Sequence, residues 1–273
     1  MKKHIITLGA DPEIFIKNET EIVSAEGLTE GGSKEFPKPI STVGHAIQED
    51  GIMFEYNIPP SKTEDEWVEN HKFCLDYLDI LAKANGYELS NVVSSEINPM
   101  YLISPQATTF GCEPDWNVYL QDINPTPDNN TNLRCAGGHV AIGYVQEGEE
   151  GDFKITEKIV QIFDMFLTLP ALFKDNDTRR RELYGKAGSF RVKEWGVECR
   201  ALSNFWIQSE DLMRWVYKQS IKVAELVLEN EAEADELIEK YSDRVREAID
   251  TNNLELATII LEEINETNLI LNQ

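Results

Sequence analysis

Residues 137–145 read GGHVAIGYV, and apolar side chains alternate along this stretch with small or polar ones. Successive side chains of a β-strand point to opposite faces. The pattern therefore predicts a strand with one apolar face for packing. Its second face carries His139 beside Ala141 and Gly143, which leave room above the strand for a ligand.

Three further segments alternate in the same way: GADPEIFI (9–16), GIMFEYNI (51–58) and GVECRAL (196–202). Their polar faces carry acids, an amide or an arginine: Asp11, Glu13, Glu55, Asn57, Glu198 and Arg200. An ordinary solvent-facing sheet would mix Lys, Thr and Ser freely. If the four segments pair in one sheet, three glutamates and His139 converge above it. Carboxylate oxygens are hard ligands for Mg²⁺ or Mn²⁺, and one imidazole excludes neither.

Helical patterns complete the chain and predict an α+β fold. Thr63 and Glu66 form a capping box at the start of a helix that Gly86 closes. A second helix is expected from near Thr156, with Pro170 breaking or kinking it. From about residue 209 onward, apolar stripes on charged helices predict packing faces. We therefore expect a catalytic domain over residues 1–208 and a helical extension over 209–273, packed on that domain.

The composition limits the partners and the compartment. The 273-residue chain has a net charge of −24, which disfavours nucleic acid and anionic membrane surfaces as main partners. No apolar run approaches the roughly 18–20 residues of a membrane span. The opening MKKHIITLGADPE has too short an apolar run for a signal peptide, and the four cysteines show no paired spacing. We expect a cytoplasmic protein, in the host cytoplasm if a phage encodes it.

A basic segment interrupts this acidic chain. Residues 179–200 hold seven Lys or Arg and three Glu, a local charge of +4. Three glycines predict that most of it is a loop leading into the strand with Glu198 and Arg200. A solvated loop is the simplest alternative. Guanidinium groups, however, bind phosphate oxygens in a fixed fork, and arginines facing metal-binding acids suit phosphoryl transfer. Neither a GxxxxGK[ST] nor a GxGxxG motif is present.

Several motifs resemble one known family. They are GADPEIF, FEYN, GCEPDWN, R-x-AGGH-x-x-IG from Arg134, and RR-x-x-YGKAGSFR-x-K-x-x-GVE-x-R-x-LSNFW over residues 180–206. Together they resemble the phage carboxylate–amine ligase type 2 (amidoligase) family, which belongs with glutamine synthetase and γ-glutamate–cysteine ligase. The resemblance spans about residues 5–207. It implies a curved, mainly antiparallel sheet like the glutamine synthetase catalytic domain, with helices on its convex face and ATP and Mg²⁺ or Mn²⁺ on its concave face.

The resemblance also implies residue roles. Glu13, Glu55 and Glu198 would bind metal, and His139 would lie near metal and nucleotide. The nucleotide phosphates would be held by three cationic residues: Arg180, Lys186 and Arg191. Arg200 would contact phosphate or an acyl phosphate. Where the family often has a second histidine, this chain has Ala141.

These roles lead to a chemical hypothesis. A substrate carboxylate attacks ATP, Arg191 and Arg200 stabilise the transferring group, and an amine displaces phosphate after losing a proton to Asp11 or Asp50. The substrates would be small-molecule or peptide carboxylates and amines, and a homo-oligomer is possible because related enzymes often assemble. The alternatives are a kinase of guanidino or carboxyl groups, and a non-catalytic phage structural or binding protein that retains the fold.

Overall fold

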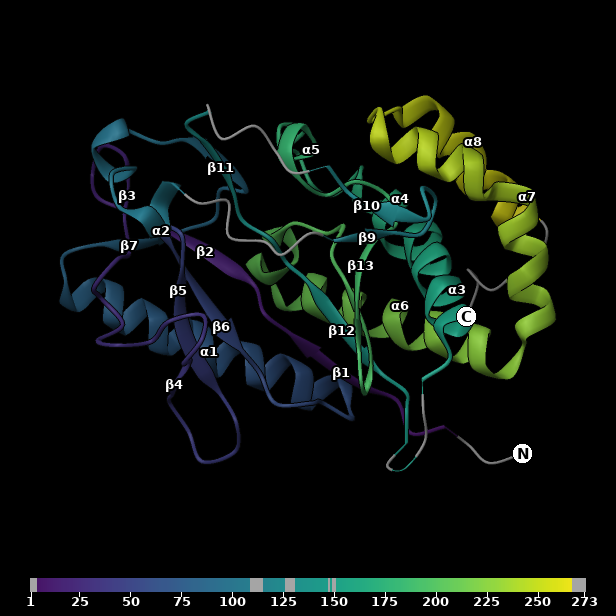
Figure 1. Ribbon diagram of the computed structural model, residues 1–273, viewed down its shortest axis with the longest axis horizontal. Coiled ribbons are helices and arrows are strands. Elements are labelled where there is room, and N and C mark those ends of the chain that lie inside the picture. The colour runs from purple at the N-terminus through teal and green to yellow at the C-terminus, as the bar shows by residue number, and fades with distance from the viewer. Residues whose placement is uncertain (1–3, 109–114, 126–130, 147, 149–150, 267–273) are drawn as a thin grey trace.

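Two antiparallel sheets carry the polar side chains singled out from the sequence. They meet along residues 7–17, which supply one strand to each sheet (Figure 1). The computed structural model describes residues 4–108, 115–125, 131–146, 148 and 151–266. The first sheet has the order β1 (Thr7–Ala10), β12 (Val140–Gly143), β14 (Gly196–Cys199), β13 (Ser189–Lys193), β9 (Trp116–Asn117) and β10 (Asp122–Ile123).

The second sheet lies on the other side of this segment. Its order is β3 (Ile22–Val23), β2 (Glu13–Lys17), β6 (Met53–Asn57), β5 (Ala46–Asp50) and β4 (Lys38–Pro39), with β7 (Glu88–Ser90) also paired to β2. A separate pair joins β8 (Ser94–Glu96) to β11 (Leu133–Cys135). The strands of these ladders all pair antiparallel in the described part of the chain, as expected from the sequence.

The segment predicted as one strand over residues 9–16 is two strands, β1 and β2, separated by Asp11 and Pro12. Proline has no N–H for a ladder, so a break here is expected on physical grounds. Hydrogen bonds continue across the break: Pro12 O accepts from Tyr56 N at 3.3 Å, and Glu13 N donates to Gly137 O at 2.9 Å. The four charged segments therefore do not lie in one regular sheet. They converge because β1 and β2 connect two sheets.

Helices cover the apolar face. The longer ones are α1 (Glu64–Ala84), α3 (Phe153–Phe163), α6 (Glu210–Glu229), α7 (Glu231–Asp250) and α8 (Leu254–Glu266). Helix α1 packs on β6 and β7, and α3 packs on β13 and β14. Helix α6 packs against both α1 and α3, and α7 lies between α3 and α8 (Figure 1). The short helical segments are α2 (Pro105–Thr108), α4 (Leu169–Ala171), α5 (Arg180–Leu183), and the 3₁₀ turns η1 (Pro99–Tyr101) and η3 (Asn204–Gln208).

Local signals explain where the first helices begin and end. The capping box of Thr63 and Glu66 is present, and α1 ends just before Gly86, whose φ is +80°. Helix α3 starts at Phe153, earlier than predicted, because the side chain of Asp152 caps it. It runs through a π-helical segment, η2 (Asp164–Thr168), into α4, and the helix ends soon after Pro170.

The last three helices share the core with the sheets. Their buried stripes include Val216, Tyr241 and Ile260, and Trp67 of α1 donates its indole N–H to Met213 O of α6 at 3.0 Å. No described helix is both long and apolar enough to cross a bilayer.

Candidate active site

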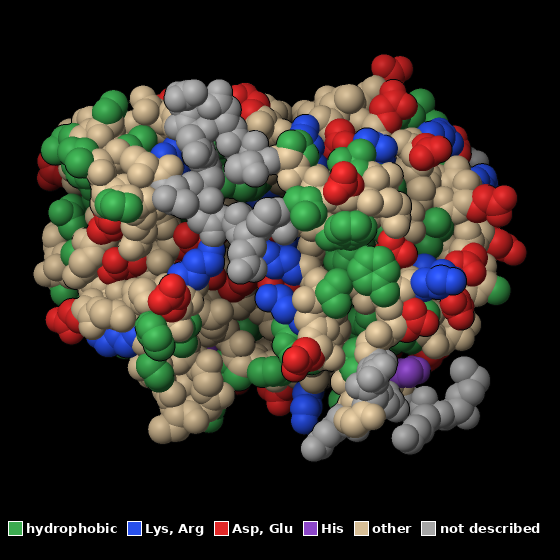
Figure 2. All heavy atoms as spheres, viewed as in Figure 1, with side chains coloured by type: hydrophobic (Ala, Val, Ile, Leu, Met, Phe, Trp, Pro, Cys, Tyr) green, Lys and Arg blue, Asp and Glu red, His purple; other side chains and the backbone are tan. Residues whose placement is uncertain are grey.

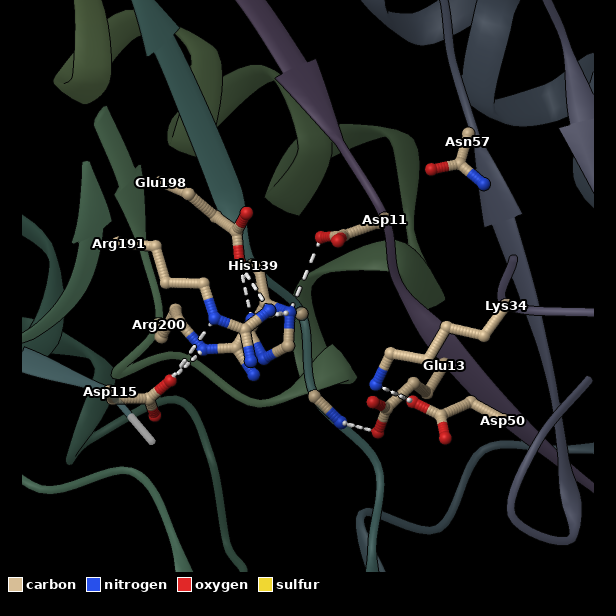
Figure 3. A network of polar contacts seen from close by, with 12 residues as sticks. Asp11, Glu13, Lys34, Asp50, Asn57, Asp115, His139, Arg191, Glu198 and Arg200 are labelled. Carbon is tan, nitrogen blue, oxygen red and sulfur yellow. Dashed lines mark hydrogen bonds and ion pairs between the residues drawn. The ribbon is translucent and has the colours of Figure 1, made fainter. Parts of the chain in front are cut away.

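The charged side chains form two adjacent rows across the first sheet. Glu198 faces Ala141 on β12 and Arg191 on β13. The second row lies two residues along each strand from the first. In it, His139 comes just before β12 and Arg200 just after β14, and Asp11 lies beside them (Figure 3). The opposite face of the same strands carries buried Val140, Ile142 and Val197. The alternation read from the sequence therefore places these charges on one side of the sheet.

The first acidic group comprises Asp11, His139 and Glu198, whose potential ligand atoms lie within 4.8 Å of one another. Nδ1 of His139 is 3.3 Å from Oδ1 of Asp11. Burial, and next the charge of Arg200, hold the pKa of His139 well below its usual value, so the imidazole is neutral. Burial and Glu198 raise the pKa of Asp11 to about 7. The His139–Asp11 contact is therefore not an ion pair. Nη1 of Arg200 lies 3.2 Å from Nδ1 of His139, and because a guanidinium can only donate, Nδ1 accepts from Arg200. Neutral imidazole is also the form that binds metal ions.

The second acidic group comprises Glu13, Asp50 and Glu55 of the other sheet, also within 4.8 Å. Glu13 and Glu55 face each other across β2 and β6. Burial, and next the charge of Asp50, raise the pKa of Glu13 to about 7, and burial with three neighbouring acids raises that of Glu55 well above its usual value. Carboxylates this close repel unless they hold protons or share a cation. Their chemistry fits a divalent metal ion.

Gly137 connects the two acidic groups. Its N–H donates to Oε2 of Glu13 at 2.6 Å. A Cβ at this position would lie 2.7 Å from Nε2 of His139 and 3.4 Å from Oε2 of Glu13. The AGGH motif therefore needs glycine here because the backbone passes between two candidate metal ligands.

Cations surround Glu198. Arg200 Nη1 contacts its Oε1, Lys193 Nζ lies 2.7 Å from its Oε2, and Arg191 Nη1 lies 3.6 Å from Oε1. Burial alone would raise the pKa of Glu198, but Arg200 and its other neighbours lower it to about 2. Asp115 lies 2.6 Å from Nε of Arg200 and 3.6 Å from Nε of Arg191. These ion pairs hold both guanidinium groups beside the first acidic group.

Two cavities adjoin the acids. The larger, of about 400 Å³, extends over Gly9, Ala141 and Gly143 to Lys193 and Trp195, and includes Asp11 and Glu198. The smaller, of about 50 Å³, is lined by Glu13, Asp50, His139, Arg180, Arg200 and further residues. Figure 2 shows Lys, Arg, Asp and Glu side chains gathered in the hollow between the two halves of the molecule.

The structure brings together most of the residues singled out from the sequence. Glu13, Glu55, His139, Glu198, Arg191, Arg200, Asp11 and Asp50 all belong to the network. Arg180 lies in the smaller cavity, where its guanidinium donates to Ala201 O at 3.2 Å. Lys186 lies in a turn, and it is not among the described residues that line either cavity.

The basic segment is also more regular than predicted, because it contains α5 and β13 rather than being mostly loop. Four site residues had no individual role assigned from the sequence: Lys34, Asp115, Lys193 and Trp195. Nζ of Lys34 lies 3.7 Å from Oδ2 of Asp50. Asp115 lies in the GCEPDWN motif, which was its only sequence signal. The preceding residues of that motif, including Cys112, lie outside the described residues.

The sequence matches the family described as Phage phiEco32-like COOH.NH2 ligase-type 2 over residues 126–267, just over half of the chain. The chain belongs to this family and is a carboxylate–amine ligase, an enzyme that forms carbon–nitrogen bonds. The match includes His139, Arg191, Glu198 and Arg200. It continues beyond residue 207, where the motif resemblance ends, through α6, α7 and the described part of α8.

Solved structures that resemble the chain include a ligand-free structure of GmaS and a bifunctional glutathione synthetase from Pasteurella multocida. The first has a TM-score of 0.45 at 11% identity, covering 100% of this chain and 71% of that one. The second has a TM-score of 0.41 at 11% identity, covering 96% and 49%. A search of curated proteins finds no match.

Proposed function

We propose that the protein is an ATP-dependent, Mg²⁺-requiring ligase that joins a carboxylate to an amine through an acyl phosphate. The observation that carries this proposal is the position of the two acidic groups. They lie side by side between two cavities, with Arg191, Lys193 and Arg200 beside them. Acids that hold metal next to fixed guanidinium groups are what phosphoryl transfer requires.

In this proposal each acidic group holds divalent metal. Asp11, His139 and Glu198 would bind one ion, and Glu13 and Glu55 would bind another, with Asp50 beside them. Bound Mg²⁺ would neutralise the oxygens of the β- and γ-phosphates. The raised pKa values of Asp11 and Glu13 support this assignment, because a cation removes the repulsion that keeps protons on these acids. Asp11, which the sequence suggested as a base, is thereby reassigned as a ligand.

The two cavities suit different substrates. The larger has a floor of small residues and apolar walls at Ile58, Pro60 and Trp195, with Lys193 beside Glu198, which suits a nucleotide. The smaller offers Arg180 and Arg200 to a carboxylate. Arg180, expected at the nucleotide phosphates, is therefore proposed to bind the acid substrate instead.

The chemistry follows from these positions. A carboxylate oxygen of the substrate attacks the γ-phosphorus of ATP, the bond to the bridging oxygen breaks, and ADP leaves. Arg191 and Arg200 stabilise charge on the transferring group, a contribution of about 10³–10⁵ in rate for a well-placed arginine. The amine then attacks the acyl carbon and phosphate leaves. We propose Asp50 as acceptor of the amine proton, because it is the more exposed member of its group and lines the acid cavity.

We extend the proposal to the architecture. The curved sheet with helices behind it supports likeness to the glutamine synthetase catalytic domain, with residues 1–208 catalytic and 209–273 a helical extension. A small molecule suits the larger cavity, of about 400 Å³. The smaller, of about 50 Å³, has room for little more than a carboxylate group, and a peptide substrate stays a prediction. A homo-oligomer stays a prediction, and analytical ultracentrifugation measures it directly.

Product analysis tests the function. The protein is incubated with ATP, Mg²⁺ and a metabolite extract, and products are identified by mass spectrometry beside a Glu198→Gln control. ADP together with a new amide, formed only by the unmodified protein, supports the ligase. A phosphorylated acid or guanidine without an amide supports the kinase alternative. Absence of both ADP formation and Mg²⁺–ATP binding supports the non-catalytic alternative.

A further inference from the structure

The turn before β13 is held from behind by two carboxylates of the helical layer. Ala187 N donates to Oδ1 of Asp250, at the end of α7, at 2.9 Å. Gly188 N donates to Oδ2 of Asp164, in η2, at 2.6 Å. The two donors are consecutive residues, so the backbone of the turn is fixed at two adjacent points by two different helices.

Neither carboxylate occupies a position that helix formation favours. Asp250 is the last residue of α7, where the helix dipole disfavours negative charge. Asp164 is 1% exposed, and burial raises its pKa to about 7. A carboxylate in such a position destabilises the fold unless a hydrogen-bond donor compensates for it. For both carboxylates, the donor that the turn supplies is a backbone N–H.

The same turn also supports Arg180, which lines the smaller cavity. Gly185 has φ of +72°, and a Cβ there would lie 2.1 Å from Nη1 of Arg180 and 3.1 Å from Ala201 O. The Arg180 guanidinium thus lies directly against the backbone of Gly185. Movement of the turn would displace Arg180 at one end and the start of β13, which carries Arg191, at the other.

We infer that Asp250 and Asp164 are positioning residues: the helical layer holds residues 184–188 so that Arg180 stays in the cavity proposed for the carboxylate substrate. The α7 helix would then be part of the catalytic apparatus rather than a passive support. The role given to Arg180 rests on the proposed function, whereas the fixing of the turn rests on hydrogen bonds alone.

The experiment compares the full-length protein with Asp250→Ala, Asp250→Asn and the control Asp243→Ala, an exposed acid on the same helix. Hydrogen–deuterium exchange reports on the amides of residues 187 and 188. Peptide mass spectrometry after phenylglyoxal treatment reports the accessibility of Arg180, which is 5% exposed. Kinetics with the acid identified by product analysis report the KM for the acid and for ATP separately.

We expect Asp250→Ala to speed exchange about tenfold, the equivalent of one lost hydrogen bond, and to speed modification of Arg180. The KM for the acid should rise about tenfold while that for ATP stays within about twofold. Asp250→Asn keeps an acceptor oxygen and should restore most of the difference, and Asp243→Ala should match the unmodified protein. Asp164→Leu, which keeps the side-chain volume but removes the oxygen that accepts from Gly188 N, provides a second test if Asp250→Ala fails to fold.

Unchanged exchange, or faster exchange with unchanged reactivity of Arg180, would overturn the inference. Equal increases in both KM values would also overturn it, because they indicate general loosening. If the unmodified protein forms neither ADP nor amide, the proposed function fails, while exchange and Arg180 reactivity still decide whether the helices position the turn.

Discussion

At the residue scale, single residues of the candidate site each contact two charged groups at once. Gly137 supplies an N–H to Glu13 and leaves space for His139, so it joins the two acidic groups through one residue. Asp115 has a similar role for the cations, because it contacts Arg200 and Arg191 together. Each such residue fixes the relative positions of two functional groups.

Gly137→Ala should disrupt metal binding more than folding. The added Cβ would lie 2.7 Å from Nε2 of His139, so the imidazole must shift from its place beside Asp11 and Glu198. We expect Mg²⁺ or Mn²⁺ affinity, measured by calorimetry, to fall about tenfold or more, as for other disturbed ligand geometries. Gly9→Ala is the control for metal binding, because its Cβ would meet only Ala141 Cβ at 3.6 Å. Unchanged affinity in Gly137→Ala would contradict the assignment of His139.

Arg200→Ala and Glu198→Gln should each abolish ADP formation in a coupled assay. Removal of a guanidinium that stabilises transferred phosphate costs about 10³-fold or more, and loss of the Glu198 charge removes a proposed metal ligand. Circular dichroism checks that both variants fold. Lys83→Ala, which removes a surface ion pair to Asp79 at 2.6 Å on α1, is a control for general charge loss. Full turnover in either site variant would exclude our assignment.

At the element scale, short turns and breaks shape the cavities. The break between β1 and β2 places Asp11 and Glu13 toward different acidic groups. The turn between β13 and β14 carries Trp195, which is 44% exposed and lines the larger cavity. An exposed tryptophan at a cavity edge suits stacking on a flat ring.

Trp195→Ala should weaken binding of Mg²⁺–ATP without affecting the acid substrate. Loss of one aromatic contact of roughly 0.5–1.5 kcal/mol corresponds to a rise in Kd of about 2- to 12-fold. Isothermal calorimetry measures this Kd, and Trp195→Phe, which keeps an aromatic ring, should retain most of the affinity. Equal affinity for ATP in all three proteins would place the nucleotide elsewhere.

At the scale of the whole molecule, the two acidic groups come from two sheets that meet at one junction. Metal bound there would link elements from both halves of the chain, and its binding free energy would add to stability. We expect Mg²⁺ or Mn²⁺ to raise the Tm, and Glu55→Gln to remove part of that rise. The Tm shift with Ca²⁺, a larger cation that tolerates irregular oxygen ligands, is measured for comparison with the shifts with Mg²⁺ and Mn²⁺. No shift with any of the three ions would refute metal binding by these acids.

The buried Asp164 predicts a pH dependence of folding. Its pKa is about 7 in the folded protein and about 4 when unfolded, so the folded state binds more protons between these values. Its contribution to stability is therefore complete below about pH 4 and is lost as the pH rises to about 7. Relative to Asp164→Asn, the unmodified protein should be more stable at pH 5 than at pH 8, by up to about 3 kcal/mol. Urea unfolding at both pH values measures this, and an identical difference at both would contradict it.

Much of the site was predictable because strand alternation is a local property. It placed His139, Glu198 and Arg200 on one face, and the capping box at Thr63 marked α1 correctly. Asp115 could not be assigned in this way, because its partners Arg191 and Arg200 lie about 80 residues away in the sequence. Lys34 could not be assigned either, because strand alternation says nothing about a contact with Asp50 that the folding of the intervening segment makes.

The sequence by itself determined the class of elements, the acidic face and the family resemblance, because these depend on residue type and short-range periodicity. Only the tertiary structure decided that the four charged segments occupy two sheets, and that their ligands divide into two groups. It also placed Arg180 in the cavity beside Glu13 and joined α7 to the turn before β13. These features depend on the positions of residues far apart in the chain, which burial of the shared core sets and no local pattern encodes.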